Sequence, residues 1–245
     1  MRTYGVERER FITNAQGEIV SAVGTLLPLV HQIASNRGLA NIRFTYELFA
    51  GQIEDRTPPA ENLQSVETAL LENDEVLLAA ADRLGLAFNH SEFVTPEKVV
   101  SSEVNPFDER HQQIWREISL DRRIPASTVT GVHVHISASE NEAVKVLNRC
   151  RSDVIDRLIA IGDHSNLQRV NAYRTMAGVD GVPPLFACLS ELMEYINAKG
   201  GEKNVWDFVR YKPSTQTVEF RMFGATQNVD EILGYVKACQ QVFGI

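Results

Sequence analysis

Three short segments of the sequence carry pairs of charged or imidazole side chains spaced two residues apart. In an extended strand, residues at this spacing point to the same side. The pairs are Glu7 and Glu9, His133 and His135, and Glu219 and Arg221. Carboxylates and imidazoles bind divalent metals, and arginine binds phosphate or carboxylate, so the spacing predicts strands with one face suited to metal and anion chemistry.

Each pair, taken singly, also has a simpler interpretation. A Glu-x-Glu strand is usually a solvated face, a His-x-His pair among valines can belong to a core, and Glu219 with Arg221 could be a surface ion pair. The joint occurrence favours a shared site, because the alternate positions of the second and third strands are apolar. The first strand differs, since its alternate positions include Arg8 and Arg10.

A fourth segment adds two more carboxylates. Glu47 and Glu54 lie seven residues apart around Gly51, and the turn signal Thr-Pro-Pro follows at residues 57–59. With Glu7, Glu9 and Glu219, this makes five glutamates for one site. Converging carboxylates repel one another and take up protons unless cations neutralise them. An oxygen-rich set of this kind predicts magnesium, or manganese where an imidazole joins it.

Composition limits the classes of partner. The chain has 245 residues and a net charge of -8, which argues against nucleic acid as the main partner but not against a metal-bound nucleotide. Three widely spaced cysteines indicate reduced thiols and a cytoplasmic protein. The sequence enters a predicted strand almost at once, so no signal peptide is expected, and no apolar run approaches the roughly 20 residues of a membrane span.

The elements that must position these residues alternate along the chain. Hydrophobic periodicity predicts strands near residues 4–12, 42–53, 86–93, 129–137, 205–211 and 217–223. It predicts helices near residues 19–36, 61–84, 106–118, 139–161, 185–198 and 230–242, the fourth opened by a capping box at Ser139. The expected organisation is one α+β domain over residues 1–245, with helices covering one side of a mostly antiparallel sheet.

The motifs resemble a known family in order along the chain. Residues 5–11, Gly-Val-Glu-Arg-Glu-Arg-Phe, are similar to the opening strand of the glutamate–cysteine ligase type 2 family, which includes the YbdK-like carboxylate–amine ligases. Residues 47–54 with 57–59 resemble its second signature, and residues 131–137 its Gly-x-His-Val-His strand, which is also similar to glutamine synthetase. Residues 171–174 and 181–186 match the downstream region loosely, and residues 217–221 resemble the last catalytic strand.

The resemblance implies a fold and a set of roles. The fold would be a glutamine-synthetase-like funnel, a curved antiparallel sheet of about six strands with helices outside. The implied metal ligands are Glu7, Glu9, Glu47, Glu54, His133 and Glu219. The implied ATP-phosphate contacts are His135, Arg210 and Arg221. Arg174, Arg221 and Glu54 are the implied catalytic groups, with Arg174 as a clamp for carboxylate or phosphate, whereas Tyr173 is expected to pack.

The implied activity is an ATP- and magnesium-dependent ligation of a carboxylate to an amine through an acyl phosphate. Glutamate is the first acid to consider, while the natural acid, the amine and the oligomeric state, a homo-oligomer included, stay open. Two alternatives remain. A guanidinium kinase of the same superfamily would need the same face for metal and ATP, and a non-catalytic binding protein would keep only the sheet.

Overall fold

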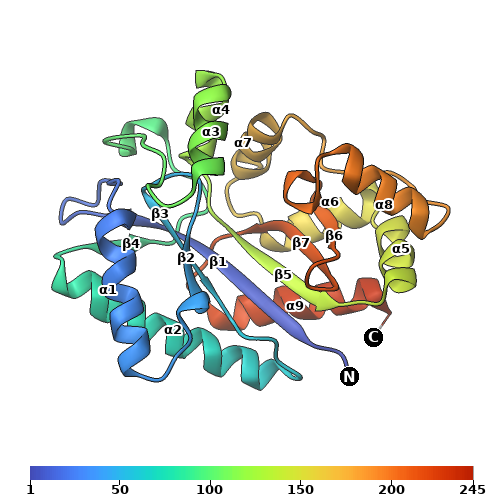
Figure 1. Ribbon diagram of the computed structural model, residues 1–245, viewed down its shortest axis with the longest axis horizontal. Helices are drawn as coiled ribbons and strands as arrows, with labels where there is room; N and C mark the ends of the chain where they lie inside the picture. Colours follow the sequence, from blue (N-terminus) through green and yellow to red (C-terminus); the bar gives the residue numbers. More distant parts are fainter. Residues whose placement is uncertain (245) are drawn as a thin grey trace.

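The protein is built around one β-sheet with helices packed against it, and its computed structural model describes residues 1–244. Seven strands form one sheet with the order β2-β3-β1-β5-β7-β6, and β4 pairs with part of β1 (Figure 1). The ladders between these strands are antiparallel. The expected α+β class with a mostly antiparallel sheet is therefore confirmed, with seven strands where about six were expected.

The strands carry candidate site residues from all four segments, except that Glu47 lies in the bend between β2 and β3. Their bounds are β1 Tyr4–Thr13, β2 Phe44–Tyr46, β3 Gln52–Arg56, β4 Ala87–Asn89, β5 Gly131–Ser137, β6 Val209–Lys212 and β7 Thr217–Gly224. The region predicted as strand near residues 42–53 contains two strands, because a bend at residues 47–51 reverses the chain between β2 and β3.

Nine α-helices lie within the described residues, together with three short 3-10 helices. The helices are α1 Val23–Asn36, α2 Leu63–Arg83, α3 Glu109–Glu117, α4 Leu120–Ala126, α5 Glu140–Arg149, α6 Ser152–Gly162, α7 Gln168–Ala177, α8 Leu189–Ala198 and α9 Val229–Phe243. The 3-10 helices are η1 Asn41–Arg43, η2 Pro96–Lys98 and η3 Glu202–Asn204.

Two expectations about helices are wrong in detail. The single helix predicted over residues 139–161 is broken into α5 and α6, because Cys150 has non-helical dihedrals (φ -77°, ψ 65°). The Ser139 side chain makes no capping hydrogen bond. The helix expected from Ile19 begins at Val23, since Ile19 instead bridges Thr13 and Val99.

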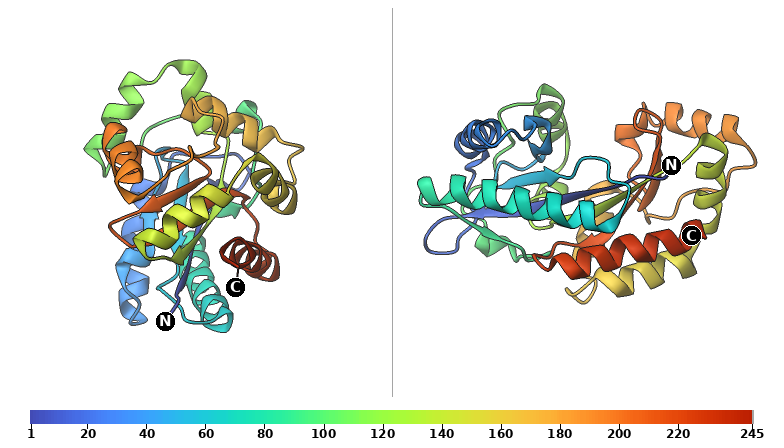
Figure 2. Two further views of the ribbon diagram at one scale, coloured as in Figure 1. Left: turned by 90° about the vertical axis from the view of Figure 1, so that its right-hand side faces the viewer. Right: turned by 90° about the horizontal axis from the view of Figure 1, so that it is seen from below.

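The hydrophobic core explains why the polar residues face the other way. Val6 on β1, Val132 and Val134 on β5, and Phe220 on β7 are buried in one cluster with residues of α5, α6 and α9. Helices α2, α6 and α9 lie along this face of the sheet (Figure 2). Because side chains alternate along a strand, Glu7, His133 and Glu219 point to the opposite, helix-poor face.

The back of β1 departs from an apolar face. Arg8 and Arg10 are 2% exposed and both donate hydrogen bonds to the fully buried carboxylate of Asp55 on β3. Asp74 on α2 lies 3.0 Å from Arg8 Nη2 and 2.6 Å from Arg10 Nη2. We call these four residues with Asn73, which donates to Asp55 at 2.9 Å, the back network.

Candidate active site

The strand register brings the predicted polar pairs into two rows across the sheet. Glu7 on β1 pairs with Arg56 on β3 and with His133 on β5. One step along, His135 pairs with Glu219 on β7, and Glu219 pairs with Arg210 on β6. Glu9 lies directly opposite Glu54. Segments more than 200 residues apart in sequence therefore meet on one face.

Side-chain distances show that the candidate metal ligands converge. Three sets of ligand atoms lie within 4.8 Å of one another: Glu9, Glu47 and Glu54; Glu7, Glu54 and His133; and Glu7, His135 and Glu219. His133 lies between β1 carboxylates, with Nδ1 3.3 Å from Glu7 Oε2 and Nε2 3.4 Å from Glu9 Oε1. The six residues predicted as metal ligands thus lie together, with His135 among them.

The acidic part of this site is short of cations. Within residues 1–244, Arg56 is the only arginine or lysine within 4.0 Å of Glu7 or Glu54, and none lies within that distance of Glu9 or Glu47. Burial and the charge of Glu54 raise the pKa of Glu9 to about 7. Burial and the charge of Glu9 raise the pKa of Glu47 to about 7. Burial and the charge of Glu7 raise the pKa of Glu54 well above its usual value.

Imidazoles govern the protonation of Glu7. Burial alone would raise the pKa of Glu7, but His135 and the hydrogen bond to His133 hold it well below its usual value. Burial and the nearby Arg221 lower the pKa of His133 to about 4. At neutral pH, His133 is therefore the neutral imidazole that metal ligation requires.

Glu219 has different surroundings from the other carboxylates. Arg210 holds it with two hydrogen bonds, Nε to Oε2 at 2.6 Å and Nη2 to Oε1 at 3.1 Å. Arg221 Nη1 lies 3.3 Å from Glu219 Oε1. Burial would raise the pKa of Glu219, but Arg210 and Arg221 hold it well below its usual value.

The donors of Arg210 and Arg221 are used differently. Arg210 Nη1 donates to the carbonyls of Glu202 and Val205, so its guanidinium is largely engaged within the protein. Arg221 Nε is buried without a hydrogen-bond partner among the described residues. Its guanidinium lies 5.6 Å from the Trp206 ring centroid and 5.8 Å from that of Tyr173. Arg221 is thus better placed than Arg210 to bind an anion.

The residues surround a pocket of about 340 Å³ whose far wall was not predicted. The lining that sequence reasoning missed comprises Thr45, Tyr46, Arg56, Asp108, Arg110, His111, Lys203, Trp206 and Lys212. Arg110 Nη2 donates to Asn204 Oδ1 at 2.6 Å, which joins the start of α3 to η3. Residues 106–118 were predicted to be a charged helix, but no signal in the sequence places that helix beside the sheet.

The sequence model described as glutamate-cysteine ligase family 2 (GCS2) matches residues 3–162, which include β1, β3 and β5 with their site residues. This match covers more than half of the chain. The chain belongs to glutamate-cysteine ligase family 2. The match spans the three strands whose register brings Glu7, Glu54 and His133 together.

Relatives of this GCS2 chain include proteins named "Putative glutamate--cysteine ligase 2". The one from Rhodopirellula baltica is 25% identical over 266 residues, covering 96% of this chain and 66% of the relative. The one from Roseiflexus sp. (strain RS-1) is 23% identical over 258 residues, covering 97% of this chain and 65% of the relative. The chain thus spans a little under two thirds of the length of these curated relatives.

Solved structures share the fold of this GCS2 chain. Glutamate–cysteine ligase from Francisella tularensis, solved in complex with AMP, has a TM-score of 0.60 at 11% identity and covers all of this chain and 66% of its own. A bifunctional glutathione synthetase from Pasteurella multocida has a TM-score of 0.58 at 15% identity, covering 99% of this chain and 37% of its own. At such identities the likeness establishes the glutamine-synthetase-like fold alone.

Three predicted site residues do not line this pocket: Glu9 and His135 lie behind its lining, beside His133 and Glu7 respectively, whereas Arg174 lies elsewhere. Arg174 lies on α7, donates through Nε to the carbonyl of Asp180, and lies 5.5 Å from the centroid of the Phe208 ring. The neighbouring Tyr173 is buried, stacks on Phe208 and donates to the carbonyl of Trp206, as expected for a packing residue.

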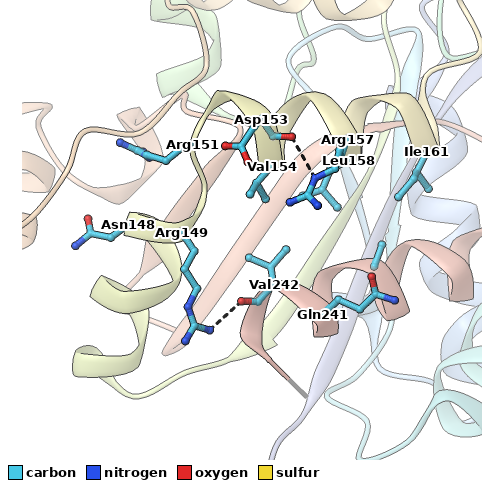
Figure 3. A pocket seen from close by; sticks show the side chains of 11 residues that line it. Asn148, Arg149, Arg151, Asp153, Val154, Arg157, Leu158, Ile161, Gln241 and Val242 are labelled. Carbon is cyan, nitrogen blue, oxygen red and sulfur yellow. Dashed lines mark hydrogen bonds between the residues drawn. The ribbon is translucent and has the colours of Figure 1, made fainter.

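A larger hollow of about 620 Å³ lies on the outer side, between α5, α6 and α9 (Figure 3). Its three arginines already donate to backbone carbonyls: Arg149 to Val242 and Phe243, Arg151 to Cys150 and Pro183, and Arg157 to Asp153. These bonds hold helix ends together, and the sheet separates this hollow from the carboxylates. We therefore assign the chemistry to the smaller pocket.

None of the helices within residues 1–244 has the length and apolarity that crossing a membrane would require.

Proposed function

We propose that this GCS2 chain is an ATP-dependent carboxylate–amine ligase of the glutamate–cysteine ligase type. The observation that carries the proposal is the convergence of five glutamates and two histidines from four chain segments beside Arg221. Metal-bound nucleotide chemistry needs oxygen ligands for the cation and a cationic group for the phosphates. Family membership and the shared fold support the same activity.

The donor set fits a divalent cation. Glu9, Glu47 and Glu54 offer carboxylates whose raised pKa values reflect a shortage of positive charge, and Glu7 with His133 offers a second group. Oxygen donors with one imidazole suit Mg²⁺ or Mn²⁺. Bound there, the cation would neutralise charge on the phosphates of ATP during phosphoryl transfer.

The reaction would proceed in two steps. A substrate carboxylate oxygen attacks the γ-phosphorus of ATP, the bond to the β-phosphate oxygen breaks, and ADP leaves. The amine nitrogen then attacks the acyl carbon, the bond to the phosphate oxygen breaks, and phosphate leaves as the nitrogen loses a proton. The result is an amide, ADP and inorganic phosphate.

The chain's own residues would act mainly by charge and orientation. Arg221 has a buried Nε without a hydrogen-bond partner among the described residues, and this group can donate to a phosphate oxygen. His135 Nε2 is also buried without a hydrogen bond among these residues, but it lies 3.3 Å from Glu7 Oε2. Arg210 orients Glu219 with two hydrogen bonds. Fixed donors of this kind stabilise developing negative charge without having to reorganise.

The substrates follow from the family rather than from a pocket signature. Glutamate is the first acid to test, since the relatives are named for glutamate–cysteine ligation. The α3 side of the pocket contributes Asp108, Arg110 and His111. Small-molecule acid and amine substrates, ATP with Mg²⁺, and a cytoplasmic location complete the proposal.

A hydroxamate assay tests the proposed function. With ATP, Mg²⁺, a panel of acids beginning with glutamate, and hydroxylamine, an activated acyl group should be trapped as a hydroxamate. Glu54→Gln keeps the size of a proposed metal ligand but removes its charge, so hydroxamate formation should fall at least about a hundredfold, corresponding to about 2.7 kcal/mol. Glu61→Gln, an exposed change at the start of the α2 region, serves as the control.

Other products would point to other functions. A stable phosphorylated guanidinium compound without hydroxamate would identify a kinase. No product with any acid, together with ATP binding, would identify a binding protein. Full hydroxamate formation by Glu54→Gln would remove the metal role proposed for that residue.

A further inference from the structure

Arg169 is a buried arginine that sequence reasoning did not single out. It lies on α7, and its side chain reaches between the ends of β5 and β7, leaving the residue 2% exposed. Its guanidinium donates three hydrogen bonds to backbone carbonyls: Nε to Thr130 at 2.7 Å, Nη1 to Met222 at 3.0 Å and Nη2 to Arg221 at 3.2 Å. No carboxylate within residues 1–244 forms an ion pair with it.

The carbonyls of Arg221 and Met222 belong to an irregularity in the sheet. In the β5–β7 ladder, Val132 pairs with Phe223 and Val134 pairs with Phe220, so two residues of β7 lie opposite the single residue His133. This is the two-against-one count of a β-bulge, where ladder hydrogen bonds are disrupted and the strand is redirected.

The bulge changes which residues face the helices. Phe220 and Phe223 are three positions apart, yet both are fully buried in the cluster that includes α6 and α9. A regular strand would place them on opposite faces. The extra residue therefore allows Arg221 to face the pocket while the strand still closes the core with Phe223, which stacks on Tyr235 of α9.

A buried carbonyl that has lost its ladder partner needs another donor, because leaving it unpaired costs free energy. The Arg169 guanidinium donates to the carbonyls of both bulge residues and to Thr130 on the adjacent segment. One planar group with several fixed donors can satisfy carbonyls that diverge in this way, whereas a lysine ammonium lacks this geometry.

The Arg169 guanidinium also packs against Gly131, whose backbone N–H binds Glu9. The Gly131 N–H donates to Glu9 Oε2 at 2.7 Å. A Cβ at position 131 would lie 2.1 Å from Arg169 Nη2, so only glycine leaves room for the guanidinium here. Arg169 thus contacts both the strand end that holds Glu9 and the bulge that carries Arg221.

We propose that Arg169 is a positioning residue that fixes the β7 bulge and thereby aims Arg221 into the pocket. Its role in catalysis rests on the proposed function, but its role in placing Arg221 does not. Arg169 itself donates only to backbone in this arrangement, so its effect on a ligand passes through Arg221.

A double-mutant cycle with Mg·ATP tests this inference. The dissociation constant of Mg·ATP is measured by calorimetry for Arg169→Met, Arg221→Met and the double variant. Each single change should weaken binding at least about tenfold, and the double variant should be no weaker than Arg221→Met alone, because Arg169 acts through Arg221. Arg169→Lys should recover only part of the affinity.

The control separates positioning from general stability. Arg43 is also buried, at 8% exposure, and donates to the Ala69 carbonyl and to Asn73 on α2, away from the pocket. Arg43→Met should lower the melting temperature without changing the affinity for Mg·ATP. Equal affinity losses in Arg43→Met and Arg169→Met would reduce the role of Arg169 to stability.

A crystal structure of Arg169→Lys provides a readout that needs no ligand and serves if Arg169→Met fails to fold. The bulge should relax and the Arg221 guanidinium should leave its contact with Glu219. An unmoved Arg221, or affinity losses that simply add in the double variant, would overturn the inference. A wild-type protein that binds no Mg·ATP would contradict the proposed function. The position of Arg221 in the Arg169→Lys structure would still test whether Arg169 positions Arg221.

Discussion

The two faces of β1 carry charged residues in strict alternation, but each face balances its charge differently. On the back, Arg8 and Arg10 meet the buried carboxylate of Asp55 and the partly exposed carboxylate of Asp74. On the front, Glu7 and Glu9 meet Glu54 and Glu47, with Arg56 as the only guanidinium within 4.0 Å among the described residues. The back pairs its charges within the protein, whereas the front leaves carboxylates without a cationic partner.

Most of the pKa values follow the same division. Burial would raise the pKa of Asp55, but Arg8 and Arg10 hold it below its usual value. Glu9 and Glu47 on the front have pKa values raised to about 7, whereas His135 and His133 hold the pKa of Glu7 low. Burial alone therefore does not identify a binding site, and the informative sign is a buried charge that lacks a partner of opposite sign.

The largest expected effect comes from breaking the back network. Asp55→Asn removes the charge that Arg8 and Arg10 share in the core, and loss of one partner from a buried pair typically costs about 3–5 kcal/mol. The free energy of unfolding, measured by urea titration, should fall by that amount. Asp74→Asn should cost less, because the Asp74 side chain is 26% exposed and water can replace its contacts. Equal losses would mean that the two carboxylates share the role equally.

Removing a front carboxylate should have the opposite effect on stability. Glu9→Gln relieves repulsion from Glu54 directly across the ladder while keeping an acceptor for the Gly131 N–H. The metal-free protein should be as stable as wild type or more stable, and Mg²⁺ affinity should fall at least tenfold, about 1.4 kcal/mol. Calorimetric titration and thermal melts check both parts. A destabilised variant with unchanged Mg²⁺ affinity would place Glu9 with the structural charges.

The pH dependence of stability should show the front through Glu9 and Glu47. These two groups titrate near 7 in the folded protein and at their ordinary, lower pKa when unfolded. The folded state therefore holds more protons, so their contribution to the free energy of unfolding falls as pH rises through 7. Between pH 6.5 and 8 these two groups should contribute a loss on the order of 1–2 kcal/mol without metal.

Histidines oppose part of this loss. The pKa values of His133 and His90 are lowered to about 4, so the unfolded state binds more protons near the ordinary histidine pKa, and these groups destabilise the folded state at the lower end of the window. Saturating Mg²⁺ should remove the carboxylate contribution, because the cation replaces the protons. Thermal melts with chelator and with Mg²⁺ at the two pH values provide the measurement, and a change in stability that is the same with and without Mg²⁺ would contradict the assignment.

The smallest effect is expected for Arg174, which lies outside the pocket. Arg174→Met removes a contact with Phe208 and one hydrogen bond to Asp180, so stability should change by about 1 kcal/mol or less. Affinity for Mg²⁺ should be unchanged, since Arg174 does not line the pocket. A raised KM for the carboxylate substrate would instead support the clamp that the family resemblance implied.

The sequence allowed the front to be predicted because side chains in strands have a period of two. Spacing assigned Glu7 with Glu9, His133 with His135, and Glu219 with Arg221 to one face of each strand, and the register brings these three strands together. The back of β1 could not be interpreted from the same strand, because the partners of Arg8 and Arg10 lie on β3 and on α2.

Other features had weaker signals or none. Phe223 shares the phase of Glu219 and Arg221 in the sequence, and this apolar residue at a polar position was the one available sign of the bulge. Helix α7 was not predicted, since its segment is polar and begins after Asn166 and Leu167, both in the left-handed conformation. Arg169 could not be recognised before its carbonyl partners were known.

The strand order also has a consequence for how the chain emerges during synthesis. β1 ends at Thr13, but its neighbour β5 does not begin until Gly131, so at 5–20 residues per second β1 waits roughly 6–24 seconds for that partner. An unpaired strand is a template for aggregation, and alternating charge is a common protection. The run Glu7, Arg8, Glu9, Arg10 places charge on both faces of the nascent strand, a composition that disfavours edge-to-edge aggregation until β5 emerges.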